Sequence, residues 1–326
     1  MVDPGPAAGI GNGLDMNKRP AWILPIIIFS QFTGTSLWFA GNAIIADIQR
    51  QWSLGESALG FVTSVVQLGF ISGTLCFAVF AVSDRYSPRK VFFFCSLLGA
   101  FSNLLVYLVA DGFTSLMIFR GLTGFFLAGI YPVGMKIASG WYRQGLGKAL
   151  GFLVGALVLG SAFPHVLKGS GQSVPWETVI VVISLISAGG GALMLVLVPD
   201  GPYLFRGTRF NGRALVLIFE RRDLRAAAFG YFGHMWELYT LWAFVPMFLI
   251  SYLNDHPAVK LNISLWCFWI IAAGSLGCIG GGMVARKFGS APVAFVQLGC
   301  SGICCLLSGL IFQAPPELFL AYLIFW

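Results

Sequence analysis

The sequence predicts an all-α membrane protein that crosses the bilayer many times. Apolar residues make up 57% of the 326 residues and charged residues only 10%, and the mean hydropathy is +0.83. A water-exposed globular surface cannot be built from this composition. Long apolar stretches satisfy their backbone groups in lipid only as helices or closed barrels, and the strict two-residue alternation of a barrel is absent. We therefore expect transmembrane helices.

A window of roughly 20 apolar residues, the length that crosses about 30 Å of hydrocarbon, defines the individual spans. Nine complete spans are predicted near residues 21–46, 57–82, 90–110, 114–139, 146–167, 177–198, 227–252, 262–284 and 291–313. A partial tenth runs from Leu318 to Trp326 and is too short to cross a bilayer. We expect from this that the chain is a piece of a longer protein.

The segments between the spans divide the chain into four parts. Residues 1–20 are polar and rich in Gly and Pro, which predicts a disordered cytoplasmic tail. Residues 21–199 form a predicted N-terminal six-helix bundle, and residues 226–326 form an incomplete C-terminal bundle. The cytoplasmic linker between them, residues 200–225, carries Arg206, Arg209, Arg213, Arg221, Arg222 and Arg225. A charged connection of this length marks a boundary between two halves.

The distribution of Lys and Arg predicts the orientation. With the N-terminus in the cytoplasm, fifteen of the 20 fall in cytoplasmic segments and three outside, at Arg50, Lys168 and Lys260. The remaining two, Arg120 and Lys136, lie within the fourth span. We expect a multi-pass protein of the bacterial inner membrane. Because the net charge of +7 is spread over helix ends rather than gathered in one patch, no nucleic-acid partner is expected.

A charged motif follows the second span. The run Asp84-Arg85-Tyr86-Ser87-Pro88-Arg89-Lys90 resembles the cytoplasmic signature of the major facilitator superfamily. Phe80 and Ser87 stand where that signature has glycines, but its charged core is intact. The fourth span opens with Arg120-Gly121-Leu122-Thr123-Gly124, which resembles a second signature of the family. The fifth span resembles the family's Gly- and Pro-rich helix through Gly151, Gly155, Gly160 and Pro164.

The second half carries weaker traces of the same family. Gly282, Lys287 and Gly289 fit the repeated loop signature, although Arg286 replaces its acid. The run Gly233-His234-Met235-Trp236-Glu237-Leu238-Tyr239 resembles bacterial members grouped with nitrate and cyanate permeases. The resemblance implies twelve spans in two six-helix halves that rock around a central site. It also implies a transporter without a cofactor.

The motif after the second span contains a candidate conformational latch. Asp84, Arg85, Arg89 and Lys90 lie where two helices meet the cytosol. A carboxylate paired with cations at such a helix end can hold one state of a rocking transporter. The alternative is an ordinary positively charged turn with a capping acid.

Arg120 and Lys136 are the cations inside the fourth span. An unpaired charge there costs roughly 2.5 kcal/mol or more, so Arg120 should face a cavity or a partner and could bind an anionic substrate or a proton-coupling acid. Alternatively, Arg120 could snorkel to the outer interface. For Lys136, nearer the cytoplasmic end, we expect snorkelling.

His234 and Glu237 form the candidate proton-coupling pair. Three residues apart in the seventh span, they share a helix face, and both can change protonation when buried. The alternative is a pair that only packs helices or lies in a wet vestibule without changing charge.

Polar and aromatic residues on the first span of each half are candidate solute contacts. Gln31, Asn42 and Tyr239 are the first choices, since binding sites place a few polar groups on an apolar wall. Interhelical hydrogen bonding and interfacial anchoring are the alternative roles.

These features favour a secondary active transporter for a small solute, with a small organic or inorganic anion as the preferred substrate and protons as a candidate coupling ion. The alternatives are a proton-coupled exporter of drug-like solutes and a non-transporting sensor or assembly protein of the same fold. An enzyme is not expected, because the histidines at 165, 234 and 256 are scattered and form no metal or catalytic cluster. We expect a monomer without a metal.

Overall fold

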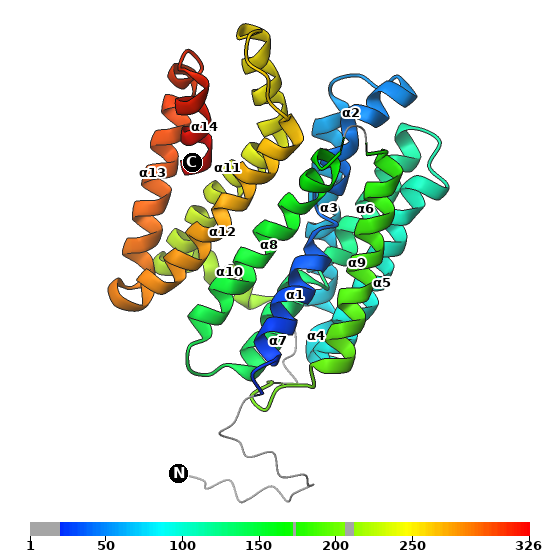
Figure 1. Cartoon of the computed structure of the whole chain (residues 1–326). Coiled ribbons are helices and arrows are strands. Elements are labelled where there is room, and N and C mark those ends of the chain that lie inside the picture. The colour runs from blue at the N-terminus through cyan, green and yellow to red at the C-terminus, as the bar shows by residue number, and fades with distance from the viewer. Residues whose placement is uncertain (1–19, 172–173, 206–211) are drawn as a thin grey trace, which may run out of the picture.

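The computed structural model describes residues 20–171, 174–205 and 212–326, and these residues are helical with no strand among them. The expected tail, and Arg206 and Arg209 of the expected linker, lie outside the described residues. The helices are α1 Ile23–Thr35, α2 Ala40–Trp52, α3 Ala58–Val79, α4 Val82–Arg85, α5 Pro88–Leu108, α6 Phe113–Leu127, α7 Tyr131–Trp141, α8 Leu146–Gly169, α9 Trp176–Leu197, α10 Arg213–Glu220, α11 Arg222–Asp255, α12 Ile263–Phe288, α13 Ser290–Ile311 and α14 Pro316–Phe325 (Figure 1).

The predicted spans are confirmed. Within the described part of the chain, nine helical segments are long and apolar enough to cross a membrane, and α14 is a shorter apolar helix at the position of the partial tenth span. The first span extends to Trp52, beyond its predicted end at 46. The seventh is the longest, with 34 residues. The all-α membrane fold is therefore confirmed.

Two of the predicted spans are broken in the middle. The first consists of α1 and α2, separated by residues 36–39, and the fourth of α6 and α7, separated by residues 128–130. Pro132 follows the second break and cannot donate a hydrogen bond to a preceding turn. At the first break, the hydroxyls of Thr33, Thr35 and Ser36 donate to carbonyls of the preceding turn. Such bonds compete with the helical ladder and bend a helix.

The burial pattern is that of a protein with lipid around it. Large apolar side chains point outward, among them Val196, 74% exposed, and Leu306, 84% exposed. Polar side chains such as Gln31, Asn103 and Arg120 are fully buried. A protein surrounded by water would be stabilised by the opposite arrangement. In a bilayer, the polar groups must find partners inside the bundle.

The first six spans contact the later ones mainly through α8 and α12, which pack against each other along their length (Figure 1). They are antiparallel, so that Gly151 lies against the carbonyl of Cys278 and Gly155 against Ser275 and Ile279. At the opposite end, Asn262 donates to the carbonyl of Gly169 over 3.1 Å. Small residues allow the two backbones this close approach.

A second close contact joins α3 to α6. A Cβ at Gly69 would overlap the carbonyl oxygen of Gly121, and a Cβ at Gly124 would overlap that of Val66. These neighbours are backbone atoms, which cannot move aside as the end of a flexible side chain can. In contrast, a Cβ at Gly60, on the same helix as Gly69, would meet nothing within 4 Å.

We predict opposite effects for alanine at these two glycines of α3. Gly69→Ala should lower the free energy of unfolding by about 1–3 kcal/mol, because α3 and α6 must move apart to admit the added methyl group. Gly60→Ala should leave it unchanged or raise it by up to about 1 kcal/mol, the difference in helix propensity. Thermal unfolding in detergent micelles measures both. Equal changes in the two variants would contradict the α3–α6 packing.

Candidate functional site

The break in the first span is held by the side chain of Arg120 on α6. Its guanidinium donates to the carbonyls of Trp38 (2.7 Å) and Leu37 (3.1 Å) in the break. It also donates to the side-chain oxygen of Asn103 on α5, over 2.9 Å. A helix interruption leaves carbonyls without helical donors, and here the guanidinium supplies them. Arg120 thereby joins α6, α5 and the α1–α2 break.

The surroundings of Arg120 exclude one of its predicted roles, snorkelling to the outer interface. The side chain is 0% exposed, so it does not snorkel to an interface. All three of its hydrogen-bond acceptors are neutral, and its Nε has no partner within the described residues. Gly41 makes room for it, because a Cβ there would lie 2.8 Å from this Nε. The positive charge is thus bound but has no carboxylate among its hydrogen-bond partners.

An aromatic cluster links the α1–α2 break to α11. Trp38 stacks on Tyr239 with 5.8 Å between ring centroids, and Phe39 stacks on the same ring at 6.4 Å. Phe39 also meets Trp242 edge to face at 5.5 Å. Trp38 also contacts Phe70 of α3, with 4.7 Å between ring centroids. The two spans that lead each half therefore meet through aromatic faces, with Tyr239 at the centre of the contact.

Trp38, on the first span, is a further functional candidate beside the first choices Gln31, Asn42 and Tyr239. The residue is 2% exposed, and its indole Nε1 is buried without a hydrogen-bond partner within the described part of the chain. Buried indole groups usually find an acceptor. An unused donor beside the inter-half contact is thus available to a solute or a water molecule.

Gln31 and Asn42, the other predicted solute contacts, have different environments. Asn42 donates to the hydroxyl of Thr63 over 2.7 Å and so joins α2 to α3, which fits the packing alternative. Gln31 is fully buried against α7, where a Cβ at Gly134 would overlap its amide oxygen. Neither polar atom of the Gln31 side chain has a partner within the described residues. Gln31 therefore remains a candidate for contact with a solute or water.

The predicted pair on α11 is not joined by a hydrogen bond in the described structure. Glu237 instead accepts hydrogen bonds from Ser301 and Cys305 of α13 and, over 3.0 Å, from the indole of Trp326. The Nδ1 atom of His234 is buried and has no hydrogen-bond partner among the described residues. A single carboxylate oxygen thus connects α11 to α13 and to Trp326, the residue that follows α14.

The predicted latch is divided between two contacts. Asp84 pairs with Lys136 of α7 over 2.5 Å, and the same ammonium donates to the carbonyl of Ser83. Lys136 therefore has a counter-ion, and our expectation that it snorkels is wrong, because α7 brings it beside the turn after α3. Arg89 lies 4.0 Å from Asp200 and donates to the carbonyl of Leu195.

Arg85 and Lys90, the other two predicted latch residues, are exposed and have no ion pair within the described part of the chain. The structure thus supplies two partners that the motif alone does not reveal, Lys136 and Asp200.

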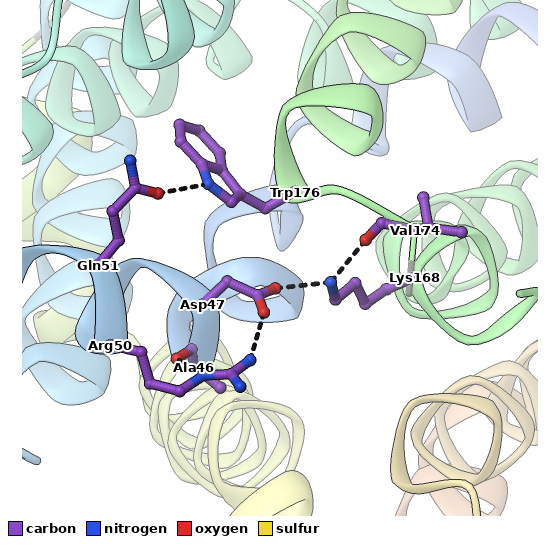
Figure 2. A network of polar contacts seen from close by, with 7 residues as sticks. All are labelled: Ala46, Asp47, Arg50, Gln51, Lys168, Val174 and Trp176. Atoms are coloured by element: carbon purple, nitrogen blue, oxygen red, sulfur yellow. Dashed lines mark hydrogen bonds and ion pairs between the residues drawn. The ribbon is translucent and has the colours of Figure 1, made fainter. Parts of the chain in front are cut away.

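A second polar network lies at the end of the bundle opposite α4 (Figure 1), which we call the Asp47 end, and Figure 2 shows its contacts. Asp47 pairs with Arg50 over 2.6 Å and with Lys168 of α8 over 2.7 Å. Lys168 also donates to the carbonyl of Val174, and the indole of Trp176 donates to Gln51 over 2.8 Å. These contacts tie the ends of α2, α8 and α9 together. The spans of the first half are therefore fixed at both ends, here and at the turn that carries Asp84, the Asp84 end.

Comparison with known proteins agrees with this architecture. The family model for the Major Facilitator Superfamily matches residues 26–326. The chain belongs to the Major Facilitator Superfamily. Membership also confirms the resemblance predicted from the charged motif after α3 and the glycine-rich signature of α6.

The relatives in this family are remote. The uncharacterized transporter YgaY of Escherichia coli O157:H7 is 27% identical over 181 residues, which cover 53% of this chain and 44% of the relative. The same match is found in strain K12. The chain therefore aligns with less than half the length of these relatives.

Solved structures share the fold. A bacterial homolog of the human lysosomal transporter Spinster, in an inward-facing and occupied conformation, superposes with a TM-score of 0.63 at 16% identity. The match covers 93% of this chain and 70% of that chain. The unoccupied form of a bacterial Spinster homolog gives a TM-score of 0.57 at 17% identity, covering 85% and 64%. Membership and fold together establish a multi-pass integral membrane protein.

We predict that Arg120→Lys destabilises the protein although it keeps the charge. A lysine ammonium cannot span the carbonyls of Leu37 and Trp38 and the amide of Asn103 in one planar fork. The free energy of unfolding should fall by about 2–4 kcal/mol, the range for breaking a buried charged network. Thermal unfolding in detergent measures the loss. The matched control is Arg286→Lys at the exposed end of α12, which should change it by less than about 0.5 kcal/mol.

We predict measurable coupling between Asp84 and Lys136. Their side chains are only 26% and 22% exposed, so a double-mutant cycle with Asp84→Asn and Lys136→Gln should give a coupling of about 1–2 kcal/mol. The comparison cycle is Asp47→Asn with Arg50→Gln, where the arginine is 78% exposed. That pair should couple by less than about 0.5 kcal/mol. Equal coupling in the two cycles would argue against a specific contact at the Asp84 end.

Proposed function

We propose that the protein is a secondary active transporter that carries a small organic anion with a planar or aromatic part. The observation that carries this proposal is the buried charge of Arg120, whose hydrogen-bond acceptors are all neutral, beside the aromatic contact between the two halves. The charge would attract the anion, and Trp38 and Tyr239 would contact its planar part. The halves would rock about this region to give alternating access.

The charge of Arg120 would act on the solute mainly through its field. Two of its nitrogens already bind protein groups, and only Nε is without a partner in the described structure. In a protein interior with an effective dielectric constant of about 20, a unit charge at ~8 Å contributes about 2 kcal/mol. That energy corresponds to roughly 30-fold preference for an anion over a neutral molecule of the same shape. A direct contact is therefore not required for charge selectivity.

A second candidate is a neutral or cationic drug-like solute exchanged for protons. Two observations favour it. The guanidinium of Arg120 already donates hydrogen bonds to protein groups, and the ring faces of Trp38, Phe39 and Tyr239 can also bind a cation. Proton coupling would act through Glu237, whose carboxylate connects α11 to α13 and Trp326. Protonation would weaken these contacts, and so could alter how the helices pack.

The proposed orientation places the Asp84 end in the cytoplasm, from the bias of Lys and Arg toward that end. The Asp84–Lys136 pair would then hold the cytoplasmic ends of α3 and α7 together in one state of the transport cycle. We propose a monomer, since the six spans of the first half and the α8–α12 seam bury the polar groups within one chain.

The test uses three probes of one shape and different charge: benzoate, benzamide and benzylammonium. With the protein reconstituted in liposomes, we expect counterflow and binding of benzoate to exceed those of benzamide by roughly 10- to 30-fold, and benzylammonium to be weakest. In Arg120→Gln this ratio should fall toward one, a readout that does not depend on how much folded protein is recovered. The reverse order of probes would support the second candidate.

The same liposomes test coupling and transport itself. If Glu237 carries the coupling proton, an imposed pH gradient should drive uptake in the wild type, and Glu237→Gln should retain counterflow without responding to the gradient. Uptake that is independent of the gradient in both would remove Glu237 from this role. Binding of a probe without any flux would instead indicate a sensor built on the same fold.

A further inference from the structure

A groove opens at the Asp84 end on the surface formed by α3, α4 and the beginning of α5. It has a volume of about 660 Å³. Its lining combines two kinds of side chain: the cations of Arg85, Arg89 and Lys90, and the apolar groups of Phe77, Val82, Tyr86, Val91, Phe94 and Cys95, with Ser87 and Asp200 beside them. The groove is separate from the Trp38–Tyr239 contact, where the solute is proposed to bind.

The cations of the groove are only partly used by the protein. Arg89 is engaged with Asp200 and with the carbonyl of Leu195. Asp200, the acid of the groove, also accepts a hydrogen bond from Ser87 over 2.7 Å. Arg85 and Lys90 are exposed and have no ion pair within the described residues. The groove therefore presents an excess of positive charge to an incoming group.

The apolar part of the groove extends from these cations toward the middle of the bundle. Tyr86 and Phe94 are 64% and 57% exposed, and both line the groove together with the cations. Deeper in, Phe77 and Cys95 lie against Gly129, in the break between α6 and α7. A ligand that filled the groove would thus have a charged end near Arg85 and an apolar end close to a helix break.

We propose that this groove binds one anionic phospholipid, with its phosphate between Arg85 and Lys90 and the first part of an acyl chain along Phe94 and Phe77. The charges are complementary, and the order from charged to apolar follows the order of groups in a lipid. The position fits as well, because the groove lies where spans emerge from the hydrocarbon on the side that the positive-inside bias assigns to the cytoplasm. Basic pockets between spans on that side are known to hold anionic headgroups.

The location of the groove gives the bound lipid a structural consequence. Asp84, one residue before Arg85, is paired with Lys136 on α7, and the apolar end of the groove lies at the α6–α7 break. A lipid in the groove would contact both sides of this pair through α4 and the break. Its occupancy would therefore stabilise the state in which the Asp84–Lys136 pair is formed.

The test is native mass spectrometry of the intact chain in detergent, titrated with phosphatidylglycerol or with phosphatidylcholine of the same acyl chains. We expect one phosphatidylglycerol to bind more tightly than phosphatidylcholine. The double substitution Arg85→Gln with Lys90→Gln should weaken its binding by roughly 10- to 30-fold, since each cation near a membrane surface contributes about a factor of five. Phosphatidylcholine binding should change little.

The matched control is Arg286→Gln with Lys287→Gln. These residues form an equivalent Arg-Lys pair in the last turn of α12, are also exposed, and line no part of the groove. This variant should bind phosphatidylglycerol as the wild type does. Without lipid, the two double variants should unfold at the same temperature. This measurement checks that both are folded.

Three results would overturn the proposal. Equal weakening in the two double variants would indicate a non-specific attraction to positive charge. Equal affinity of the wild type for the two lipids would remove the role of the headgroup charge. The third probe is glycerol phosphate, which has the anion but no acyl chain. If it displaces phosphatidylglycerol as well as the lipid itself does, the groove is a site for soluble anions instead. Failure of glycerol phosphate to compete supports the lipid.

Discussion

A guanidinium buried beside an interrupted helix holds the centre of this molecule together. The first span cannot continue through residues 36–39, and the carbonyls of Leu37 and Trp38 would lie without donors in a dry interior. Arg120 supplies them from α6 and is oriented in turn by Asn103 of α5. Because the break fixes the direction of Trp38 and Phe39, the aromatic contact with Tyr239 on α11 depends on the same interaction. The aromatic contact between the halves is thus linked to the hydrogen bonds of this one side chain.

The same arrangement explains how a costly charge can also be useful. An unpaired charge in a membrane is expensive, and the hydrogen bonds to neutral acceptors offset part of this cost without cancelling the charge. A carboxylate partner would have removed the field that favours an anionic solute. In the proposed transporter, structure and selectivity are therefore two consequences of one buried group.

Polar contacts at the two ends of the bundle hold the first half around this centre. At the Asp47 end, Asp47 and Lys168 join α2 to α8, and at the Asp84 end, Asp84 and Lys136 join the turn after α3 to α7. Between the halves, α8 and α12 approach through glycines and a hydrogen bond from Asn262. Close packing of small residues along this seam permits sliding or tilting with little loss of contact, which suits the proposed transporter.

The sequence alone determined the spans, because the thickness of the bilayer sets a local requirement of about 20 apolar residues that each segment meets by itself. Two further features are also local and could be recognised from the sequence. They are the charged motif that includes Asp84 and the arginine at position 120 inside an apolar span. Partners distant in the chain were decided by tertiary structure: Lys136 lies 52 residues from Asp84, and Arg120 lies 82 residues from the carbonyl of Trp38. Tertiary structure likewise decided that Glu237 accepts a hydrogen bond from Ser301 of α13 and none from the nearby His234 on its own helix. No local sequence pattern encodes such partners, since they depend on which faces of separate helices meet after packing.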